Sequence, residues 1–250
     1  MTQSPEPSPD ESTTCKNCGT IFKGNYCMHC GQSAIIHRLN LKYLLHNFFH
    51  AITHMDAGYL HTIKDLAIRP GHSIREYLHG KRSGHGDPLV MLLIVGGLCT
   101  WLYKDFHIKT LTSVDIGSLQ DGMQIVSLKF FALACLSYSL IFSLSDFLIF
   151  RYKRYNYIEL LVMNIFSCIE ILVFFIVLVP VWLLCNSFGL GNYIRIAVTL
   201  IDFAYLIFVR YQFFEVSVDK KAKVRIVGSA LAILLLFAVS GWKTLQLLFG

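Results

Sequence analysis

Residues 157–184 read YIELLVMNIFSCIEILVFFIVLVPVWLL, and its two glutamates are the only charged residues in this run. A helix needs about 20 mostly apolar residues to cross the hydrocarbon core of a bilayer, so the run is long enough to span one. Four further apolar segments lie near residues 88–103, 128–150, 193–213 and 226–248. The pattern predicts an all-α polytopic membrane protein with about five transmembrane helices in residues 87–250.

The placement of charge predicts how these helices are oriented. Only 15% of the 250 residues are charged, whereas soluble domains carry about 25%. Lysine and arginine gather in residues 38–82, 151–154 and 220–225, and cytoplasmic loops are the ones enriched in these two residues. We therefore expect a multi-pass membrane protein with a cytoplasmic N-terminus and a C-terminus on the opposite side of the membrane.

Before the first apolar segment the chain divides into three parts. Residues 1–13 are polar and rich in proline and serine, which is typical of a disordered tail. Residues 14–33 hold four cysteines, and residues 38–86 combine basic and apolar residues in a way that favours helices lying in the cytoplasmic interface. In this last part Ser73 is the expected N-cap of a short helix. Four of its cations are expected to meet anionic lipid headgroups: Arg69, Arg75, Lys81 and Arg82.

The cysteine-rich part reads CKNCGTIFKGNYCMHCGQ over residues 15–32 and contains two C-x2-C pairs. Four thiolates at this spacing can surround Zn²⁺ tetrahedrally, so we expect a zinc ribbon that holds one structural zinc ion per chain. The expected ligands are Cys15, Cys18, Cys27 and Cys30. Iron in a similar cage is the alternative that the sequence leaves open. Because the ribbon carries only Lys16 and Lys23 as cations, no nucleic-acid partner is expected.

Histidines form a second candidate site. His46, His50 and His54 follow each other at intervals of four residues, and Asp56 comes shortly after them. On one helix the three imidazoles would share a face, and such a group can bind a divalent metal. The alternative is that they form hydrogen bonds to lipid headgroups or to the backbone at the interface.

Two carboxylates stand inside the apolar segments. At a rise of 1.5 Å per residue, Glu170 lies about 20 Å from the cytoplasmic end of its helix and Asp202 about 14 Å from the outer end of the next. Across about 30 Å of hydrocarbon the two fall at similar depth. They either mark an ion or proton path or form a protonated, hydrogen-bonded pair between helices. Asp146, Glu159 and Arg195 lie nearer the interfaces, where we expect them either to extend their charged ends into the interface or to pair locally.

The order of these motifs resembles a known family. CKNCG…YCMHCGQ is followed by ITHMDAGYLHTIKDLAIRPGHSIREYLHGKR and by an Asp-Pro pair before the first apolar segment. This order is similar to that of the DUF3667 family, bacterial membrane proteins common in Bacteroidetes. The matching positions are His54, Asp56, Gly58, Thr62, Pro70, Gly71, Arg75, Glu76, Tyr77, Gly80, Lys81, Arg82 and Pro88. The stretch SGHGD before Pro88 lacks the aromatic residues typical of the family. The resemblance implies a multi-pass protein of the bacterial inner membrane, with its C-terminus in the periplasm, and it implies no reaction.

Three functions follow from these patterns. The first is a non-enzymatic scaffold in the membrane whose zinc ribbon docks a protein partner, with membrane lipids as its other partner. The second is a small transporter or ion-handling protein that uses Glu170 and Asp202. The third is a metalloenzyme at the membrane surface that uses the histidines His46, His50 and His54. Because no catalytic constellation is recognisable, we rank the scaffold first.

Overall fold

The structure is a computed structural model that describes residues 12–36, 38–53, 58–105, 131–153, 155–214, 226 and 228–229. Within these residues the fold is mostly helical, as predicted. A two-stranded antiparallel sheet precedes seven α-helices. The elements are β1 (Thr13–Thr14), β2 (Ile21–Phe22), α1 (Leu41–Thr53), α2 (Gly58–Ile68), α3 (Pro70–Leu78), α4 (Pro88–Asp105), α6 (Phe131–Ile149), the 3₁₀ turn η1 (Arg151–Lys153), α7 (Tyr157–Ser187) and α8 (Gly191–Phe213). The apolar segment predicted at 226–248 lies almost entirely outside the described residues.

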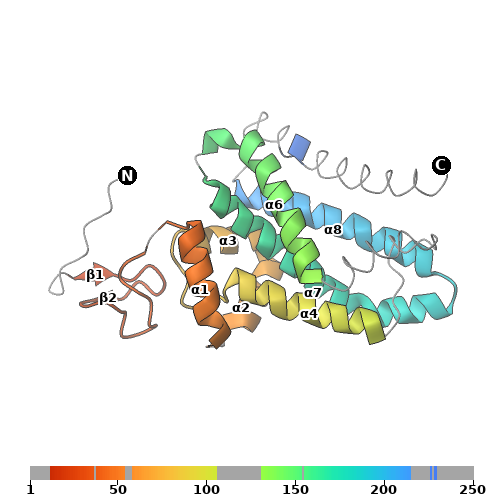
Figure 1. Ribbon diagram of the computed structural model, residues 1–250, viewed down its shortest axis with the longest axis horizontal. Coiled ribbons are helices and arrows are strands. Elements are labelled where there is room, and N and C mark those ends of the chain that lie inside the picture. Colours follow the sequence, from red (N-terminus) through yellow and green to blue (C-terminus); the bar gives the residue numbers. More distant parts are fainter. Residues whose placement is uncertain are drawn as a thin grey trace.

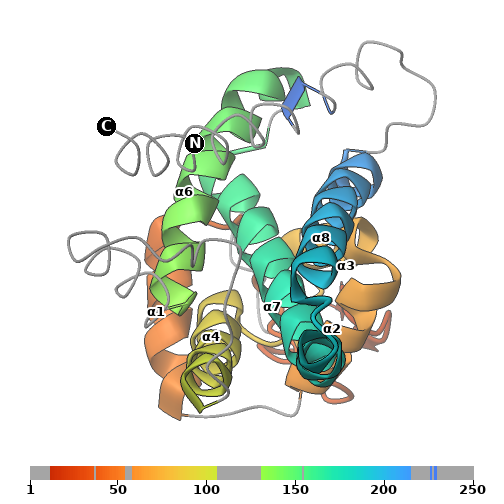
Figure 2. The same ribbon diagram turned by 90° about the vertical axis from the view of Figure 1, so that its right-hand side faces the viewer.

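Helix α7 is the central element of the helical part. It packs against α4, α6 and α8, and Figure 2 shows it between these three helices. Helices α4 and α7 run away from the sheet, and α8 runs back toward it (Figure 1). The end of α6, the start of α7 and the end of α8 meet in an aromatic cluster. In this cluster the rings of Phe150 and Phe214 stack at 3.7 Å, and those of Tyr155 and Phe213 lie 4.9 Å apart.

The two halves of α7 have different surroundings. Residues 159–172 are almost entirely buried, whereas most side chains in residues 173–187 are half-buried or exposed. The buried half is covered by α2 and α3 as well as by the longer helices. Tyr77 of α3, for example, meets Phe166 of α7 edge to face at 5.3 Å. The short helices of the region 38–86 therefore belong to the same core as the longer apolar ones.

Helix α3 begins three residues earlier than the sequence predicted. Pro70 occupies its first turn, where the missing N–H costs nothing and the fixed φ favours a helix. The expected cap, Ser73, is therefore a buried residue inside the helix, and that prediction is wrong. Gly71 touches α8 so closely that a Cβ atom would lie 2.4 Å from the backbone nitrogen of Phe213. Only glycine permits this approach of the two helices.

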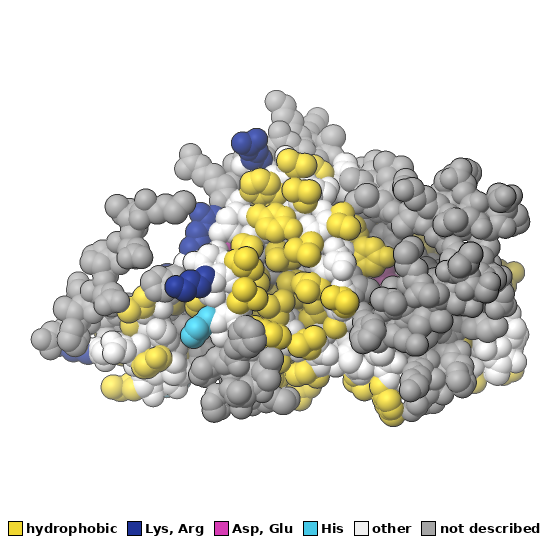
Figure 3. Space-filling view, viewed as in Figure 1, with side chains coloured by type: hydrophobic (Ala, Val, Ile, Leu, Met, Phe, Trp, Pro, Cys, Tyr) yellow, Lys and Arg dark blue, Asp and Glu magenta, His cyan; other side chains and the backbone are white. Residues whose placement is uncertain are grey.

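Within the described residues, one helix is long and apolar enough to cross a membrane by length and composition. This helix is α7, with 31 residues and a mean hydropathy of 2.8 in its most apolar window. Two shorter apolar helices lie at Pro88–Leu102 and Cys135–Ile149. The helical part presents a broad apolar face, shown in Figure 3. Its exposed apolar side chains on α4 and α6 include Leu93, Ile94, Leu98, Trp101, Leu133, Leu140, Ile141, Leu144 and Leu148.

Candidate metal centre

Two matching turns hold the four cysteines at the N-terminal end of the structure. In the first turn the Gly19 amide donates to the Cys15 carbonyl, and the Cys15 amide donates to the Thr20 carbonyl. In the second turn Gly31 and Cys27 make the equivalent bonds, the latter to Gln32. Both glycines have φ near +70°, a conformation that favours glycine over other residues. Strand β1 leads into the first turn and strand β2 leads out of it, so the pairing of the two strands fixes the position of the turn.

The sulfur atoms of Cys15, Cys18, Cys27 and Cys30 all lie within 4.8 Å of one another. The separation is 3.5 Å between Cys15 and Cys30 and 3.6 Å between Cys18 and Cys27. A tetrahedral site with Zn–S bonds of about 2.3 Å places its sulfur atoms about 3.8 Å apart. The four predicted cysteines therefore come together in a cluster that could bind a metal such as zinc. In the part of the chain that is described, no other group of His, Cys, Asp or Glu side chains meets the same criterion.

The ionisation of the thiols differs across the cluster. Burial raises the pKa of Cys15 to about 11, whereas the contact with the Thr20 hydroxyl lowers the pKa of Cys18 to about 5. A metal ion binds thiolates, so of these two cysteines it is Cys15 that has to lose its proton when the metal binds. Metal binding at this site should therefore weaken as the pH falls.

The cysteine cluster is joined to the helices through the α3–α4 loop, residues 79–87. The side-chain oxygen of Gln32 accepts the backbone amides of Arg82 at 3.1 Å and Ser83 at 2.8 Å. The Ser83 hydroxyl donates in turn to the carbonyl of the metal-site residue Cys30. A Cβ atom at Gly80, whose φ is +109°, would lie 2.6 Å from Ile36. The ribbon and the residues that follow it are thus joined to this loop by hydrogen bonds and by close packing.

A second connection follows the ribbon directly. Arg38 binds the carboxylate of Glu159 with two nitrogens, at 2.6 and 2.8 Å. Asn156 caps the start of α7 and also donates its side-chain amide to the Leu39 carbonyl at 2.9 Å. Glu159 therefore has a local partner, since it accepts the Asn156 amide at 2.8 Å, and also a distant one, Arg38, which is 121 positions away. Together the two connections hold the ribbon against the starts of α4 and α7.

The cations beside the loop are engaged within the protein. Glu76 receives Arg69 and Lys81, each at 2.8 Å. Burial of Glu76 opposes ionisation, but the bonds from Lys81 and Arg69 outweigh it and hold the pKa of Glu76 below its usual range. The guanidinium of Arg82 lies over the ring of Tyr43 at 4.7 Å. The sequence predicted that these cations contact lipid headgroups. In the structure Arg69, Lys81 and Arg82 instead contact side chains of the protein and hold the loop in place.

Other residues of the family motif fix the C-terminal end of the same loop. The Thr62 hydroxyl donates to the Gly58 carbonyl at 2.8 Å and accepts the Gly86 amide at 2.9 Å, which joins α2 to the end of the loop. Pro88 opens α4, and the carboxylate of Asp87 accepts two amides of the first turn of that helix. Among the motif cations, Arg75 contacts His72 on the exposed side of α3.

His85, near the end of the α3–α4 loop, contacts both α2 and α3. Its Nε2 atom is 3.2 Å from the Ser73 hydroxyl, and its ring meets that of His61 edge to face at 5.8 Å. Burial lowers the pKa of His85 below its usual value of 6.5, and Asp65, His61, Lys81 and Glu76 also act on it. The structure thus keeps this imidazole neutral at a position that touches α2 and α3.

Acidification is expected to destabilise the fold through His85. Between the folded-state pKa and 6.5 the unfolded chain binds more protons, so stability falls as the pH drops from about 6.5 through the folded-state pKa. Thermal unfolding of the detergent-purified protein between about pH 7.5 and 5.5 measures this loss. His85→Gln keeps a nitrogen near Ser73 and cannot titrate, so its midpoint should fall less steeply. Equal slopes for both proteins would show that another group is responsible.

The predicted histidine site lies largely outside the described residues. His46 is exposed on α1, but the side chain of His50, together with His54 and Asp56, is not described. The predicted second metal site therefore stays a prediction.

The two carboxylates of the apolar segments, Glu170 and Asp202, occupy different environments. Glu170 is fully buried in α7, whereas Asp202 is half-buried on α8. Neither oxygen of Glu170 has a hydrogen-bond partner among the described residues, so no hydrogen bond to Asp202 is formed.

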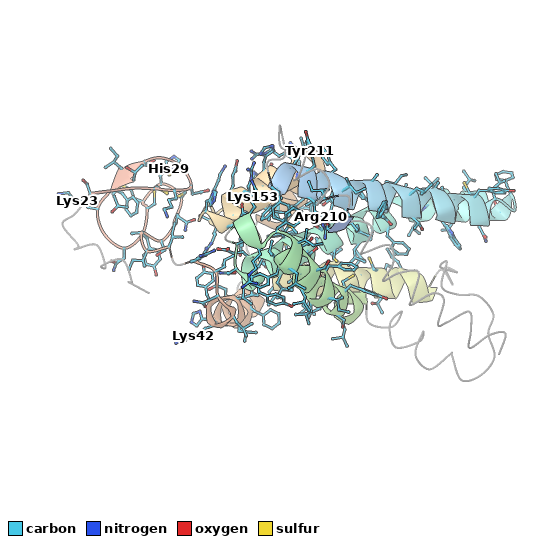
Figure 4. The ribbon with its side chains drawn as sticks, turned by 90° about the horizontal axis from the view of Figure 1, so that it is seen from above. Lys23, His29, Lys42, Lys153, Arg210 and Tyr211 are labelled. Carbon is cyan, nitrogen blue, oxygen red and sulfur yellow. The ribbon has the colours of Figure 1, made fainter. Side chains whose placement is uncertain are left out.

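A buried polar cluster joins three helices and was missed by the sequence analysis. Arg210 of α8 binds both oxygens of Asp146 in α6 and the Asn164 oxygen in α7, at 2.9 to 3.2 Å. Asn164 also donates to Asp146 at 3.1 Å and to Ser143 at 3.2 Å. Figure 4 shows Arg210 on the part of α8 nearest the ribbon. The sequence does contain a signal for this pair, because Asp146 and Arg210 are opposite charges in two apolar segments. Asp146 was instead expected to remain near the interface or to pair locally.

Comparison with known proteins gave one match. Residues 56–99 match the model of the DUF3667 family, described as a protein of unknown function. No curated protein and no solved structure matched the chain. The match confirms the resemblance over a segment that runs from α2 into α4. This segment contains the α3–α4 loop, and the cysteines that contact the loop lie outside it.

Proposed function

We propose that the chain is a multi-pass membrane protein whose zinc-loaded ribbon is a non-enzymatic scaffold module. The ribbon fastens the cytoplasmic ends of the helices and docks a protein partner. The observation that carries the proposal is the contact between the second cysteine turn and the α3–α4 loop. Through Gln32 and Ser83, a metal-binding turn is bonded to the segment that matches the family.

The apolar surface supports the membrane part of the proposal. Soluble monomers rarely expose contiguous apolar patches larger than a few hundred Å², whereas α4 and α6 expose large apolar side chains along most of their length. Helix α7 is about 46 Å long at 1.5 Å per residue, which exceeds a hydrocarbon core of about 30 Å. Its buried first half, covered by α2 and α3, accounts for the excess on the ribbon side.

The direction in which the helices run supports the proposed orientation in the membrane. Helices α4 and α7 begin, and α6 and α8 end, on the side of the ribbon (Figures 1 and 2). Lys153, in the connection between α6 and α7, lies on this side in Figure 4. The Lys and Arg side chains visible in Figure 3 also lie toward the ribbon. A cation-rich side favours the cytoplasm, where the thiols of the ribbon stay reduced.

The chemistry of the ribbon supports a scaffold rather than an enzyme. Four thiolates complete the coordination of zinc and leave no position for a reacting water. On its surface, three apolar side chains within eight residues are strongly exposed: Ile21 at 70%, Tyr26 at 68% and Met28 at 87%. Exposed aromatic residues and methionines are enriched in protein interfaces, so this apolar tip fits a protein partner.

Site-directed crosslinking in living cells tests the scaffold function. A photoreactive amino acid at position 28 is expected to give one discrete protein adduct, because the apolar tip would be covered by the partner. The same amino acid at Leu60, which is 80% exposed on α2, should not give this adduct. Adding Cys27→Ser should abolish it, since the tip loses its shape without metal. No adduct at position 28, or one that persists without metal, would contradict the docking role.

A further inference from the structure

Glu170 is the most isolated charge-bearing group in the described part of the chain. Its side chain is 0% exposed, and neither carboxylate oxygen has a hydrogen-bond partner there. Among the described residues, the other buried charged side chains all form ion pairs: Asp146, Glu159 and Arg210. Arg210, for instance, satisfies Asp146 and Asn164 and also donates to the Leu206 carbonyl. Glu170 therefore needs a different explanation from the structural ion pairs.

Helices α2, α3 and α8 enclose this part of α7. Phe166 and Phe174 lie one turn before and one turn after Glu170 and share its face of α7. Phe166 meets Tyr77 of α3, and Phe174 meets Tyr205 of α8 at 5.2 Å. The Tyr205 hydroxyl donates to the carbonyl of Leu66 in α2 at 3.4 Å. Glu170 thus lies within a ring of aromatic and apolar contacts at the point where the short helices meet the long ones.

An ionised carboxylate is very costly in such a place. Burying an unpaired charge is so unfavourable that the group takes up a proton instead. A metal cation could also neutralise it, but hard cations are held by several oxygen ligands. Among the described residues, neither Glu170 oxygen has a hydrogen-bond partner that could complete such a ligand set. The phenol of Tyr205 in α8 interacts electrostatically with Glu170, and it carries no positive charge that could stabilise the carboxylate.

We propose that Glu170 is a proton-binding site inside the helical core, protonated at neutral pH and able to exchange its proton. Asp202, which is half-buried, is not part of this site. The site is a property of the helices α2, α3, α7 and α8, so it does not depend on a partner of the ribbon. The sequence predicted that Glu170 and Asp202 together handle ions. The proposal assigns this role to Glu170 alone and identifies the bound ion as a proton.

Infrared spectroscopy of the purified protein tests the protonation directly. At about pH 7.5, well above the ordinary pKa of a glutamic acid, the wild type should show the C=O band of a protonated carboxyl group. Glu170→Gln should remove this band, whereas the matched variant Asp202→Asn should retain it. In D2O the band should shift, which reports exchange. An identical spectrum for wild type and Glu170→Gln would overturn the proposal, and so would a band that never shifts in D2O.

Modification of the wild-type protein distinguishes a proton from a metal cation. Dicyclohexylcarbodiimide is apolar and reacts with protonated carboxyl groups, so it should label the peptide that contains Glu170. Labelling should slow as the pH rises and should proceed at the same rate in sodium chloride and in choline chloride. Protection by sodium but not by choline would mean that the carboxylate holds a metal cation and would overturn the assignment of a proton.

Discussion

Cys27→Ser is expected to reduce the zinc content of the purified protein from one ion per chain to none and to unfold residues 12–36. Cys27 is the most deeply buried of the four cysteines and begins the turn that reaches Gln32. Structural zinc in small ribbons contributes about 10–16 kcal/mol of apparent binding free energy, which is folding free energy for such a module. Elemental analysis measures the zinc, and hydrogen exchange measures the fold.

The loss should extend into one neighbouring segment and stop there. The backbone amides of Arg82 and Ser83 depend on Gln32, so their exchange should accelerate in Cys27→Ser. Amides of α6 and α7 should stay protected, because the cluster around Arg210 does not involve the ribbon. Protection of Arg82 and Ser83 that survives the loss of zinc would show that the loop is ordered independently of the ribbon.

Two control variants make the metal count decisive. Cys185→Ser changes a cysteine far along α7 and should leave one zinc per chain. His50→Ala with His54→Ala tests the predicted histidine site in the same assay. One zinc in that variant and in the wild type would assign the metal to the ribbon alone. A second metal that disappears in the variant would instead establish the histidine site.

The features that the sequence predicted well are those encoded by neighbouring residues. Two C-x2-C pairs with a glycine after each form a metal site through local turns, so the cysteine cluster could be read directly. Long apolar runs likewise predict helices, since burial or lipid contact is required along their whole length. The predicted start of α3 was three residues too late, because a proline at the first helical position starts a helix as well as a capping serine does.

The features that the sequence could not predict depend on partners distant in the chain. Arg38 and Glu159 are 121 residues apart, and Asp146 and Arg210 are 64 apart. A local rule assigns such charges to lipid headgroups or to nearby residues, because only the packed helices bring the true partners together. Likewise the motif glycine Gly80 was identified as a match, but its contact with Ile36 is visible only in three dimensions.

Arg210→Met is expected to destabilise the helical part more than any other single loss of charge. Both side chains of the pair with Asp146 are fully buried. Removing one partner leaves an uncompensated buried carboxylate, which costs about 3–5 kcal/mol. Because the cluster joins α6, α7 and α8, the cost should appear as a lower midpoint of cooperative unfolding in detergent.

Arg38→Met provides the matched control, since it removes an arginine from an ion pair of similar geometry. The Arg38 side chain is 61% exposed and that of Glu159 is 8% exposed. Water screens the Arg38 side of this pair, so its loss should cost less than the loss of the fully buried pair. The two variants therefore separate the effect of burial from that of pairing. Equal midpoints for Arg210→Met and Arg38→Met would contradict the assignment of the buried cluster as a major source of stability.

The double variant Arg210→Met/Asp146→Leu tests the mechanism of the loss. Replacing both partners of a buried pair by apolar residues removes the unpaired charge, and such replacements are often neutral. The double variant should therefore recover most of the stability lost in Arg210→Met. Recovery should be incomplete, because Asn164 loses the donor to its oxygen while keeping its bonds to Ser143 and Leu160. A double variant as unstable as the sum of both single variants would mean that packing, rather than the buried charge, sets the cost.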